Sequence, residues 1–386
     1  MDQPGRKLRI TGKGRCNLTN TASLKETLPH IGSDSRFLRN CYAQFFNHEL
    51  MQFFEVRGVP LVEERGGRVF PSSGKSLDIF LALVNELEQR SNVTIRRNCL
   101  VKVLLTATLP DADGRQRIRG VRLQGGEVLS APRVIVATGG CSYPTTGSTG
   151  IGYQWAAELG HTVVSPIPSL VGLSVAEKIP DDLIGFVLRN VRLIIGPEQG
   201  KPLCDLFGEM QFAEYGITGP IVLSASRLIS RMLHDGHTMK AHIDLKPALD
   251  CKQLDQRLLR DIDENGKRLF HDALRMWLPA EMIPLALQRL HIEYYKRLHQ
   301  INVAERKRLL TFLKDCTLEI TGTRGFEEAI VTQGGVALKE VDPKTMESKR
   351  VVGLYWVGEL LDLDADTGGY NLQIAFSTAY AAATHC

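Results

Sequence analysis

The sequence predicts an α/β fold, in which a domain with a parallel sheet is interrupted by a long insert. Two local patterns of apolar residues, and one change in the sequence pattern along the chain, support this prediction. The run Arg133–Thr138 is short, apolar and uninterrupted, as is typical of a buried strand in a parallel sheet. Residues 76–89 repeat apolar side chains at helical spacing. After His161 the chain changes to short β-type runs separated by Gly and Pro, which indicates a differently built unit.

The first part of the chain is expected to alternate between helix and strand. A helix over Ser76–Gln89 is followed by a short strand at Val93–Ile95. The runs Val101–Leu109 and Ile118–Leu123 flank the turn-forming cluster Pro110–Gly114, so we expect a β-hairpin there. This order, completed by the buried strand, favours an α/β nucleotide-binding domain.

The insert is expected to contain a β-rich part and a helical part. Short strand-like runs at regular spacing predict a barrel or sandwich; they are Val163–Val164, Val191–Ile195, Ile221–Leu223 and His242–Leu245. Residues 254–313 are charged, poor in Gly and helical in pattern, which predicts a small helical bundle. The run Thr317–Ile320 then returns to the barrel.

Strand signals come back at Ala329–Thr332 and Gly353–Val357, before a final helix. The predicted division is therefore an outer domain of residues 1–162 and 329–386, a barrel of residues 163–250 and 315–328, and a helical part of residues 251–314.

Composition narrows the function classes. The 386 residues carry a formal net charge of +4 with scattered basic residues, so we expect no nucleic-acid partner. Eight dispersed cysteines without a CxxC pair indicate a reducing cytoplasm. No apolar run reaches the roughly 18 residues of a membrane span, and the N-terminus has no signal-peptide pattern. We therefore expect a cytoplasmic protein with no membrane partner. The histidines His234, His237 and His242 lack carboxylate or thiol partners at ligand spacing, so no metal site is predicted.

The segment with the clearest chemical meaning is residues 353–373. A strand-like run leads through a Gly-bounded acidic loop into a helix that begins near Asn371. Gly368 and Gly369 would let a ligand approach the backbone closely, and the helix N-terminus presents free N–H groups and the positive end of the helix dipole. Such donors suit the N1 and C2-carbonyl edge of a flavin, which becomes negative on reduction. The alternative is a tight strand-to-helix turn that binds nothing.

Three further Gly-containing segments are candidates for cofactor contact. Residues 8–20 place Arg15 among closely spaced glycines, where it could reach a phosphate, or they form a surface loop. Thr138–Gly140 ends the buried strand, where open α/β sheets bind ligands. The turn Thr146–Gly152 resembles the Thr-Gly-rich turn of short-chain dehydrogenases, which keeps open a nicotinamide-only enzyme.

Seven segments spread along the chain together carry a family resemblance. They are Gly5–Leu8 with Thr11–Asn20, Gly67–Pro71, Ala137–Gly140, Gly216–Pro220, Val331–Val336, Asp342–Ser348 and Gly358–Gln373. In these segments the chain resembles the bacterial family of FAD-binding, aminoacetone-oxidase-like flavoproteins, a group of NAD(P)/FAD-dependent oxidoreductases. The resemblance implies an α/β fold built as a discontinuous Rossmann-like FAD-binding domain with a β-barrel insert and a small helical bundle.

The resemblance also implies which residues contact FAD. Those lining the cofactor would be Gly14, Arg15, Cys16 and Asn17. Val101 would lie near the adenine, and Thr138, Gly139 and Gly140 near the dinucleotide. Glu359 and Asp366 would bracket the phosphate and ribityl region. The flavin ring would meet Gly369, Tyr370, Asn371, Leu372 and Gln373.

The implied activity is that of an FAD-dependent oxidoreductase, with hydride transfer through flavin N5. The hydride would come from an unidentified small organic substrate or from NAD(P)H; no catalytic acid, base or nucleophile can be named. Family members begin with a strand, a GxGxxG turn and a helix, whereas this chain starts after that unit, and Lys13, Ala365 and Ile151 differ from the residues common in the family. Two alternatives therefore stay open. One is a truncated, non-enzymatic remnant with weak or lost FAD binding, and the other is an NAD(P)-dependent dehydrogenase that uses Thr146–Gly152.

Overall fold

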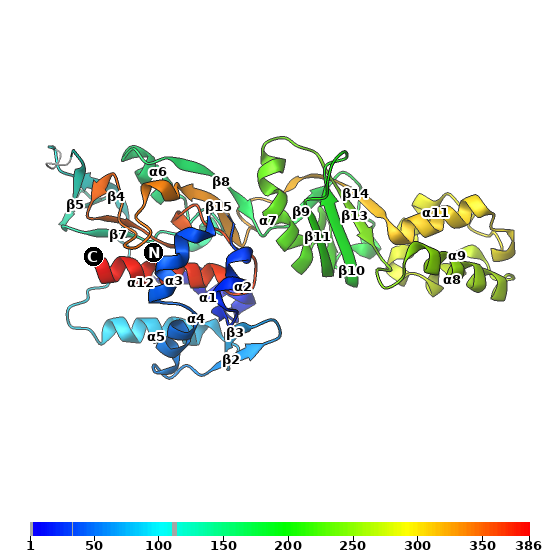
Figure 1. Ribbon diagram of the computed structural model, residues 1–386, viewed down its shortest axis with the longest axis horizontal. Helices are drawn as coiled ribbons and strands as arrows, with labels where there is room; N and C mark the ends of the chain where they lie inside the picture. The colour runs from blue at the N-terminus through cyan, green and yellow to red at the C-terminus, as the bar shows by residue number, and fades with distance from the viewer. Residues whose placement is uncertain (1–2, 33, 110–113) are drawn as a thin grey trace. The chain divides into compact units, whose positions relative to one another are not determined.

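The computed structural model describes residues 3–32, 34–109 and 114–386. By its internal contacts the chain divides into two compact units. Unit 1 comprises Met1–Pro168 and Phe326–Cys386, and unit 2 comprises Ser169–Gly325. Figure 1 shows the chain leaving unit 1 after β8 and returning to it at β15. The insert is thus a continuous stretch of chain, and unit 1 is assembled from two segments.

Unit 1 contains short parallel pairs of strands as well as antiparallel ones. β7 (Val134–Val136) pairs with β17 (Leu354–Trp356) in parallel, which confirms a parallel strand within Arg133–Thr138. The prediction that this strand is buried is wrong in part, because Ile135 is exposed. The predicted hairpin is also present, because β4 (Val101–Thr106) and β5 (Gln116–Leu123) pair antiparallel. Most of its predicted turn, residues 110–113, lies outside the described residues.

The remaining strands of unit 1 form three small groups. β5 also pairs with β6 (Val128–Ser130) and, in parallel, with β16 (Val351–Val352). β8 (Val163–Ser169) pairs with β15 (Val331–Val336). The N-terminal strands β1 (Thr19–Asn20), β2 (Leu61–Glu64) and β3 (Arg68–Pro71) form a separate sheet with β3 in the middle. The predicted strand at Val163–Val164 is therefore real, but it pairs with a strand of unit 1.

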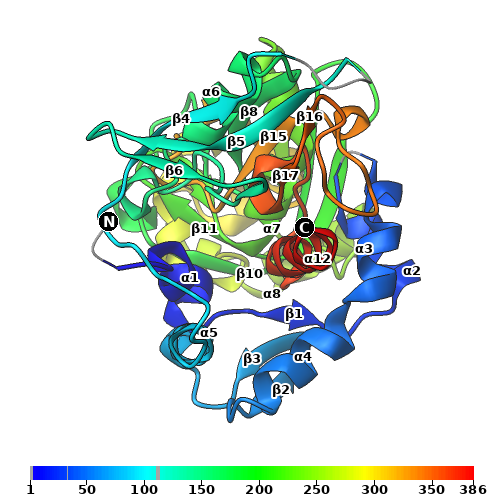
Figure 2. The same cartoon turned by 90° about the vertical axis from the view of Figure 1, so that its left-hand side faces the viewer.

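The helices of unit 1 include the predicted helix after Ser76 and the predicted final helix. They are α1 (Arg6–Ile10), α2 (Leu24–Thr27), α3 (Arg39–Gln44), α4 (Asn47–Glu55), α5 (Ser76–Glu88), α6 (Ile151–Glu158) and α12 (Tyr370–His385). Figure 2 looks along α12, which contacts β1, α3 and α4. The C-terminal helix thereby joins the N-terminal elements to the rest of unit 1.

Unit 2 contains a closed six-stranded β-barrel, in the order β10-β11-β12-β9-β14-β13. Its strands are β9 (Leu173–Val175), β10 (Val187–Gly196), β11 (Cys204–Ala213), β12 (Gly216–Thr218), β13 (Met239–Asp244) and β14 (Cys316–Thr323). The barrel confirms the predicted strands at Val191–Ile195, His242–Leu245 and Thr317–Ile320. Between β13 and β14 the chain forms helices, as predicted for residues 254–313.

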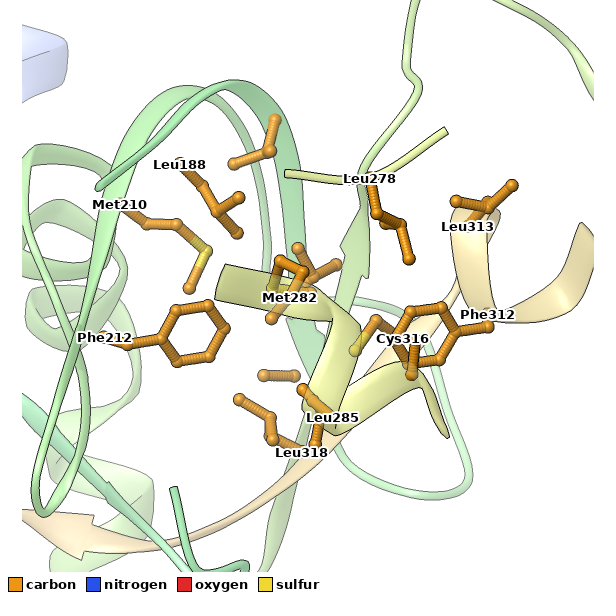
Figure 3. Close-up of a cluster of buried hydrophobic side chains, with 14 of the residues drawn as sticks. Leu188, Met210, Phe212, Leu278, Met282, Leu285, Phe312, Leu313, Cys316 and Leu318 are labelled. Carbon is orange, nitrogen blue, oxygen red and sulfur yellow. The ribbon is translucent and has the colours of Figure 1, made fainter. Parts of the chain in front are cut away.

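The helices of unit 2 share one hydrophobic core with the barrel. They are α7 (Pro220–His234), α8 (Cys251–Glu264), α9 (Phe270–Ala273), α10 (Ile283–Leu290) and α11 (Val303–Lys314). Figure 3 shows side chains from both parts, including Phe212 from β11, Met282 beside α10 and Phe312 from α11. The contacts therefore group the barrel and the helices as one unit, and the separate helical domain at 251–314 stays a prediction.

Two predicted strands are wrong. Ile221–Leu223 lies inside α7, where Pro220 occupies the first helical turn and Ile221, Ala225 and Ile229 bury one face. Helical spacing of apolar residues overrides the β preference of the branched side chains there. Val93–Ile95 is irregular, and both Val93 and Thr94 are exposed. A run of three residues forms no strand without a neighbour to supply hydrogen bonds.

Candidate functional site

Two segments at opposite ends of the sequence meet at the start of α12. The Thr19 hydroxyl donates a hydrogen bond to Gln373 Oε1 at 2.5 Å, across 354 positions of sequence. Asn20 Nδ2 donates to the Gly368 carbonyl at 3.2 Å. The structure therefore brings together two segments that the sequence analysis assigned separately to the cofactor.

Asn17 and Gly369 strengthen this junction. In its favoured orientation the Asn17 carboxamide accepts from Gly369 N at 3.1 Å and donates to the Thr19 carbonyl at 3.2 Å. Gly369 has φ +99°, and a Cβ placed on it would lie 2.3 Å from Thr19 O. Because both the backbone conformation and the contact exclude a side chain, this position requires glycine.

The N-terminus of α12 presents backbone donors to its surroundings. Gly369 is the N-cap residue and has no side chain with which to cap the helix, while its own N–H is taken by the Asn17 carboxamide. Its first turn contains no acidic residue. A helix of 16 residues whose N-cap residue has no side chain can offer the N–H groups of its first turn and a partial positive charge to an electron-rich ligand.

The acidic loop before α12 is held by side chains on both sides. Asn371 accepts from Ala365 N at 2.9 Å and donates to the Ala365 carbonyl at 2.8 Å. His30 Nδ1 lies 2.9 Å from Asp366 Oδ2, and its ring stacks on Tyr370 with centroids 4.7 Å apart. Burial raises the pKa of Tyr370. His30 was missed by sequence reasoning, since no periodicity or motif marks it as a neighbour of this loop.

A second group of contacts centres on the carboxylate of Glu359, in the turn Gly358–Leu360. Its Oε2 accepts from Lys7 Nζ at 2.7 Å and from Gly140 N at 3.3 Å. Its Oε1 accepts from the Ser142 hydroxyl at 2.9 Å and from Thr332 N at 2.8 Å. We call these five residues the Glu359 network. Four protein donors fill the roughly four lone-pair sites that a carboxylate offers.

The Glu359 network ties four distant stretches of chain together. The Thr332 hydroxyl in turn accepts from Cys141 N at 2.8 Å and Ser142 N at 3.2 Å. The Tyr153 hydroxyl donates to the Glu359 carbonyl at 2.9 Å. Thr332 and Ser142 are fully buried. Neither of them, nor Lys7, carried a signal that pointed to Glu359 in the sequence.

Thr138 is the residue of this region with an unused polar group. Its Oγ1 is buried and has no hydrogen-bond partner among the described residues. It follows β7, whose C-terminal end leads into Gly139 and Gly140. A Cβ on Gly140 would lie 2.4 Å from Thr332 Oγ1, so contact with the protein explains this glycine. A Cβ on Gly152 would lie 2.5 Å from Thr138 Oγ1, so this hydroxyl is enclosed by the protein on the side of α6.

The segment Gly14–Asn17 divides into buried and open positions. Cys16 is fully buried, and burial raises its pKa to about 11. Arg15 pairs with Glu64 at 2.5 Å, and its guanidinium lies 4.3 Å from the centroid of the Phe70 ring. At Gly14, which has φ +84°, a Cβ would meet no described atom within 4 Å. Gly14 is thus the position of this segment where the space beside the backbone is open.

The two remaining predicted cofactor residues, Leu372 and Val101, pack against different hydrophobic clusters. Leu372 packs against the same hydrophobic cluster as Cys16, which places both on the junction at α12. Val101 pairs with Leu123 in the β-hairpin and packs against the core of unit 1. Among the described residues no hydrogen bond links Val101 to α12 or to the Glu359 network.

The turn Thr146–Gly152 is packed against protein. Gly150 is the N-cap residue of α6, and its N–H donates to the Gly140 carbonyl at 3.2 Å. A Cβ would lie 2.8 Å from Cys141 Sγ at Gly150 and 2.5 Å from Leu360 Cδ2 at Gly152. Internal contacts therefore account for both glycines, without a dinucleotide beside them.

The fold and these contacts define an α/β protein with a candidate cofactor site in unit 1, at the ends of β7 and β17 and at the start of α12. Over residues 1–385 the chain matches the family described as HI0933-like protein Rossmann domain, and it belongs to that family.

Several curated relatives match along nearly the whole chain. The sequence is 34% identical over 381 residues to the 3-dehydro-bile acid delta(4,6)-reductase of Clostridium scindens. It is 29% identical over 385 residues to the ribosomal RNA dihydrouridine synthase of Haemophilus influenzae, and 29% identical over 384 residues to that of Escherichia coli. These alignments cover 98%, 98% and 99% of this chain, and 89% of each relative. Among the described residues, no helix combines the length and apolar character that crossing a membrane requires.

Proposed function

We propose that this protein is an FAD-dependent oxidoreductase that reduces a carbon–carbon double bond conjugated to a carbonyl group. The observation that carries the proposal is the N-terminus of α12, whose N-cap residue Gly369 packs against Thr19, has no capping side chain and is followed by a first turn without an acid. Donors fixed in this way favour a ring system that gains negative charge on reduction. The Rossmann-domain family and the relative named as a reductase support an oxidoreductase.

The names of the relatives suggest one kind of reaction. A 3-dehydro steroid with double bonds at positions 4 and 6 is a conjugated ketone, and dihydrouridine is uridine with two hydrogens added to a double bond beside a carbonyl. In uridine hydride adds at the carbon β to the carbonyl, and in the dienone it adds at the β or the δ carbon; in each case a proton adds to the neighbouring carbon of the same double bond. A shared site that delivers hydride would serve both, so we propose this reaction class here.

The residues present fit a flavin. When bound, FAD would supply hydride transfer through N5. The first-turn N–H groups of α12 would face the electron-rich edge of the ring, and Thr138 would lie near the dinucleotide, as the family resemblance implies. The open space at Gly14 would admit it beside the backbone. Arg15, Cys16, Asn17, Val101, Asp366 and the residues Tyr370–Gln373 remain the proposed lining. Membership of the aminoacetone-oxidase-like group also remains a proposal.

Glu359 has a positioning role in this proposal. Since four protein donors occupy its carboxylate, it fixes Gly140 and Thr332 instead of accepting from ribityl hydroxyls. Lys7 would lie at the same edge and help to orient that carboxylate.

The first experiment is a titration of the purified full chain with FAD, followed by flavin fluorescence and absorption. Saturable quenching is expected. A matched pair of variants locates the site: Gly14→Ala should weaken FAD binding about tenfold, a cost of about 1.4 kcal/mol. Gly58→Ala should not, because Gly58 also has a positive φ and open space but lies outside the proposed lining.

Substrate tests follow on the loaded protein. Reduced flavin should be reoxidised by a steroid 4,6-dien-3-one or by an RNA fragment containing uridine, and not by the saturated ketone. Folded protein that ignores FAD and binds NADPH would replace this proposal with the nicotinamide-only enzyme. If the folded protein binds neither FAD nor NADPH, the hypothesis of a non-enzymatic remnant would replace both enzyme proposals.

A further inference from the structure

Unit 2 contains an open hollow whose lining includes four cationic side chains, three of which pair with carboxylates beside it. Its volume is about 790 Å³. The lining residues that matter for its chemistry are Arg189, Arg192, Phe207, Lys246 and Arg257. We call it the β10–α8 hollow, after the elements on its two sides. Four of its lining side chains are cations and none is a carboxylate.

The hollow depends on an irregularity in the barrel. The pairing of β10 with β11 shifts register between Leu188 and Val191, and Asn190 in this stretch has φ +55°. A β-bulge of this kind turns side chains out of their regular alternation. It places Arg189 and Arg192 on the hollow, opposite the loop after β13 that carries Lys246.

The cations differ in how fully they are paired. Arg192 forms a short ion pair with Asp205 on the neighbouring strand. The other two arginines have looser partners, since Arg257 lies 3.6 Å from an oxygen of Asp261 and Arg189 lies 3.9 Å from one of Glu209.

Lys246 is the exception among these cations. Within the described part of the chain its ammonium has no ion pair or hydrogen bond, although the side chain is half-buried. Burial, and then the nearby charge of Arg257, lower its pKa. An anion placed in the hollow would offset the repulsion from Arg257 and favour the charged form of Lys246.

An aromatic ring and an apolar cavity accompany these charges. Phe207, on β11, is 63% exposed, which is unusual for a side chain of this size. A second cavity of about 290 Å³ shares Arg189, Leu245 and Lys246 with the hollow, and it is otherwise lined largely by apolar side chains such as Trp277 and Leu278. Cations and exposed aromatic surface therefore occur together on one face of unit 2.

We propose that the β10–α8 hollow binds a single-stranded nucleic acid, with phosphates on Lys246 and the arginines and a base stacked on Phe207. Strand binding of this kind combines a cationic groove with aromatic stacking. The site lies wholly in unit 2 and needs no cofactor. This proposal can therefore be tested independently of the proposed redox activity. The small net charge of the whole chain does not exclude it, because folding gathers cations that are scattered in sequence.

The test measures fluorescence anisotropy of a labelled oligouridine strand of about twelve nucleotides, a length within the range of such sites. The full chain is titrated at several salt concentrations. Phe207→Ala should weaken binding about tenfold through lost stacking. Lys246→Met, which keeps the apolar stem, should lower the slope of log K against log salt by about 0.7, the value for one phosphate contact on a single strand. Matched controls are Tyr295→Ala, which removes an exposed aromatic ring, and Lys178→Met, which removes an exposed cation; neither residue lines the hollow.

Binding that weakens in both hollow variants and in neither control would support the proposal. Equal affinities for all five proteins would overturn it, as would a wild-type protein that ignores the strand at low salt. Displacement of the strand by equimolar uridine monophosphate would also overturn it, because a free nucleotide would then be the better ligand. Thermal unfolding of each variant keeps a folding defect separate from a binding defect.

Discussion

Replacing Gly369 by alanine should show how firmly the protein itself holds the candidate site together. The new Cβ would lie 2.3 Å from Thr19 O and 2.4 Å from Thr19 C, both backbone atoms that cannot rotate away. Ordinary contact at 3.4 Å or more would need a displacement of about 1 Å. That movement would stretch the hydrogen bonds that join Thr19 to Gln373 and Asn17 to Gly369.

The expected cost can be built from three parts. The positive φ costs about 1 kcal/mol for any residue with a Cβ. Overpacking against backbone adds about 2 kcal/mol, and two weakened hydrogen bonds add about 1 kcal/mol together. Gly58→Ala is the matched control, because Gly58 also has a positive φ of +79° but its Cβ would meet nothing within 4 Å. We expect a loss of about 4 kcal/mol for Gly369→Ala and about 1 kcal/mol for Gly58→Ala.

The assay is urea unfolding without cofactor, followed by tryptophan fluorescence. Trp155 and Trp356 are buried in the core of unit 1 and report on its unfolding, whereas Trp277 reports on unit 2. The Gly369 variant should shift the unit 1 transition alone. Equal losses in the two glycine variants would refute the reasoning, because the contact with Thr19 would then cost nothing beyond the backbone strain.

Three further predictions concern stability and reactivity. The hydrogen bond from Arg350 holds the pKa of Glu340 at about 2, below its ordinary 4.5. The stabilisation that Glu340 contributes is therefore complete above pH 4.5 and is lost as the pH falls towards 2. When the free energy of unfolding is measured against pH in acid, Glu340→Gln should reduce its pH dependence by about 2 kcal/mol. In barrel strand β11, Phe212→Ala should cost about 4 kcal/mol in urea unfolding because it empties a buried site (Figure 3), whereas Phe207→Ala on the same strand should change stability by less than about 0.5 kcal/mol; similar losses would contradict the packing argument. Alkylation with iodoacetamide, read by mass spectrometry, should modify the exposed Cys251 and Cys386 in the native protein and the buried Cys16 only after unfolding, since burial raises the pKa of Cys16 to about 11.

The sequence was sufficient for elements that local patterns specify. The hairpin of β4 and β5, the parallel strand β7 and the helix α12 each have a periodicity or a turn signal of their own. The error at Ile221–Leu223 shows the limit of that approach. Three branched or apolar residues look like a strand until Gly219-Pro220 and the helical spacing that follows are weighed together.

The parts of the candidate site that lie in glycine-containing motifs could be predicted from the sequence. The polar contacts between side chains far apart in the sequence could not. Asn17 and Gly369 both stood in recognisable segments, and the structure joins them. Lys7 and Glu359 lie 352 positions apart, and no sequence pattern around either residue indicates that the two are in contact. A sequence pattern reports the period of burial along one element, but it carries no information about which side chain on another element completes a polar contact.

Glycine is required at different positions of the site for different physical reasons. These reasons distinguish glycines that the fold itself needs from glycines that a ligand would need. At Gly140 and Gly369 a Cβ would collide with Thr332 Oγ1 or with Thr19 O, so the protein needs glycine there whether or not a cofactor binds. At Gly14 a Cβ would meet no described atom. The fold therefore does not account for Gly14 by crowding, and its only internal reason is a positive φ that asparagine also tolerates. If a cofactor fills the space beside Gly14, Gly14→Asn should preserve the stability of the free protein and still block FAD binding. If that variant binds FAD as the parent does, the open space at Gly14 is ordinary solvent, and the cofactor must be held elsewhere.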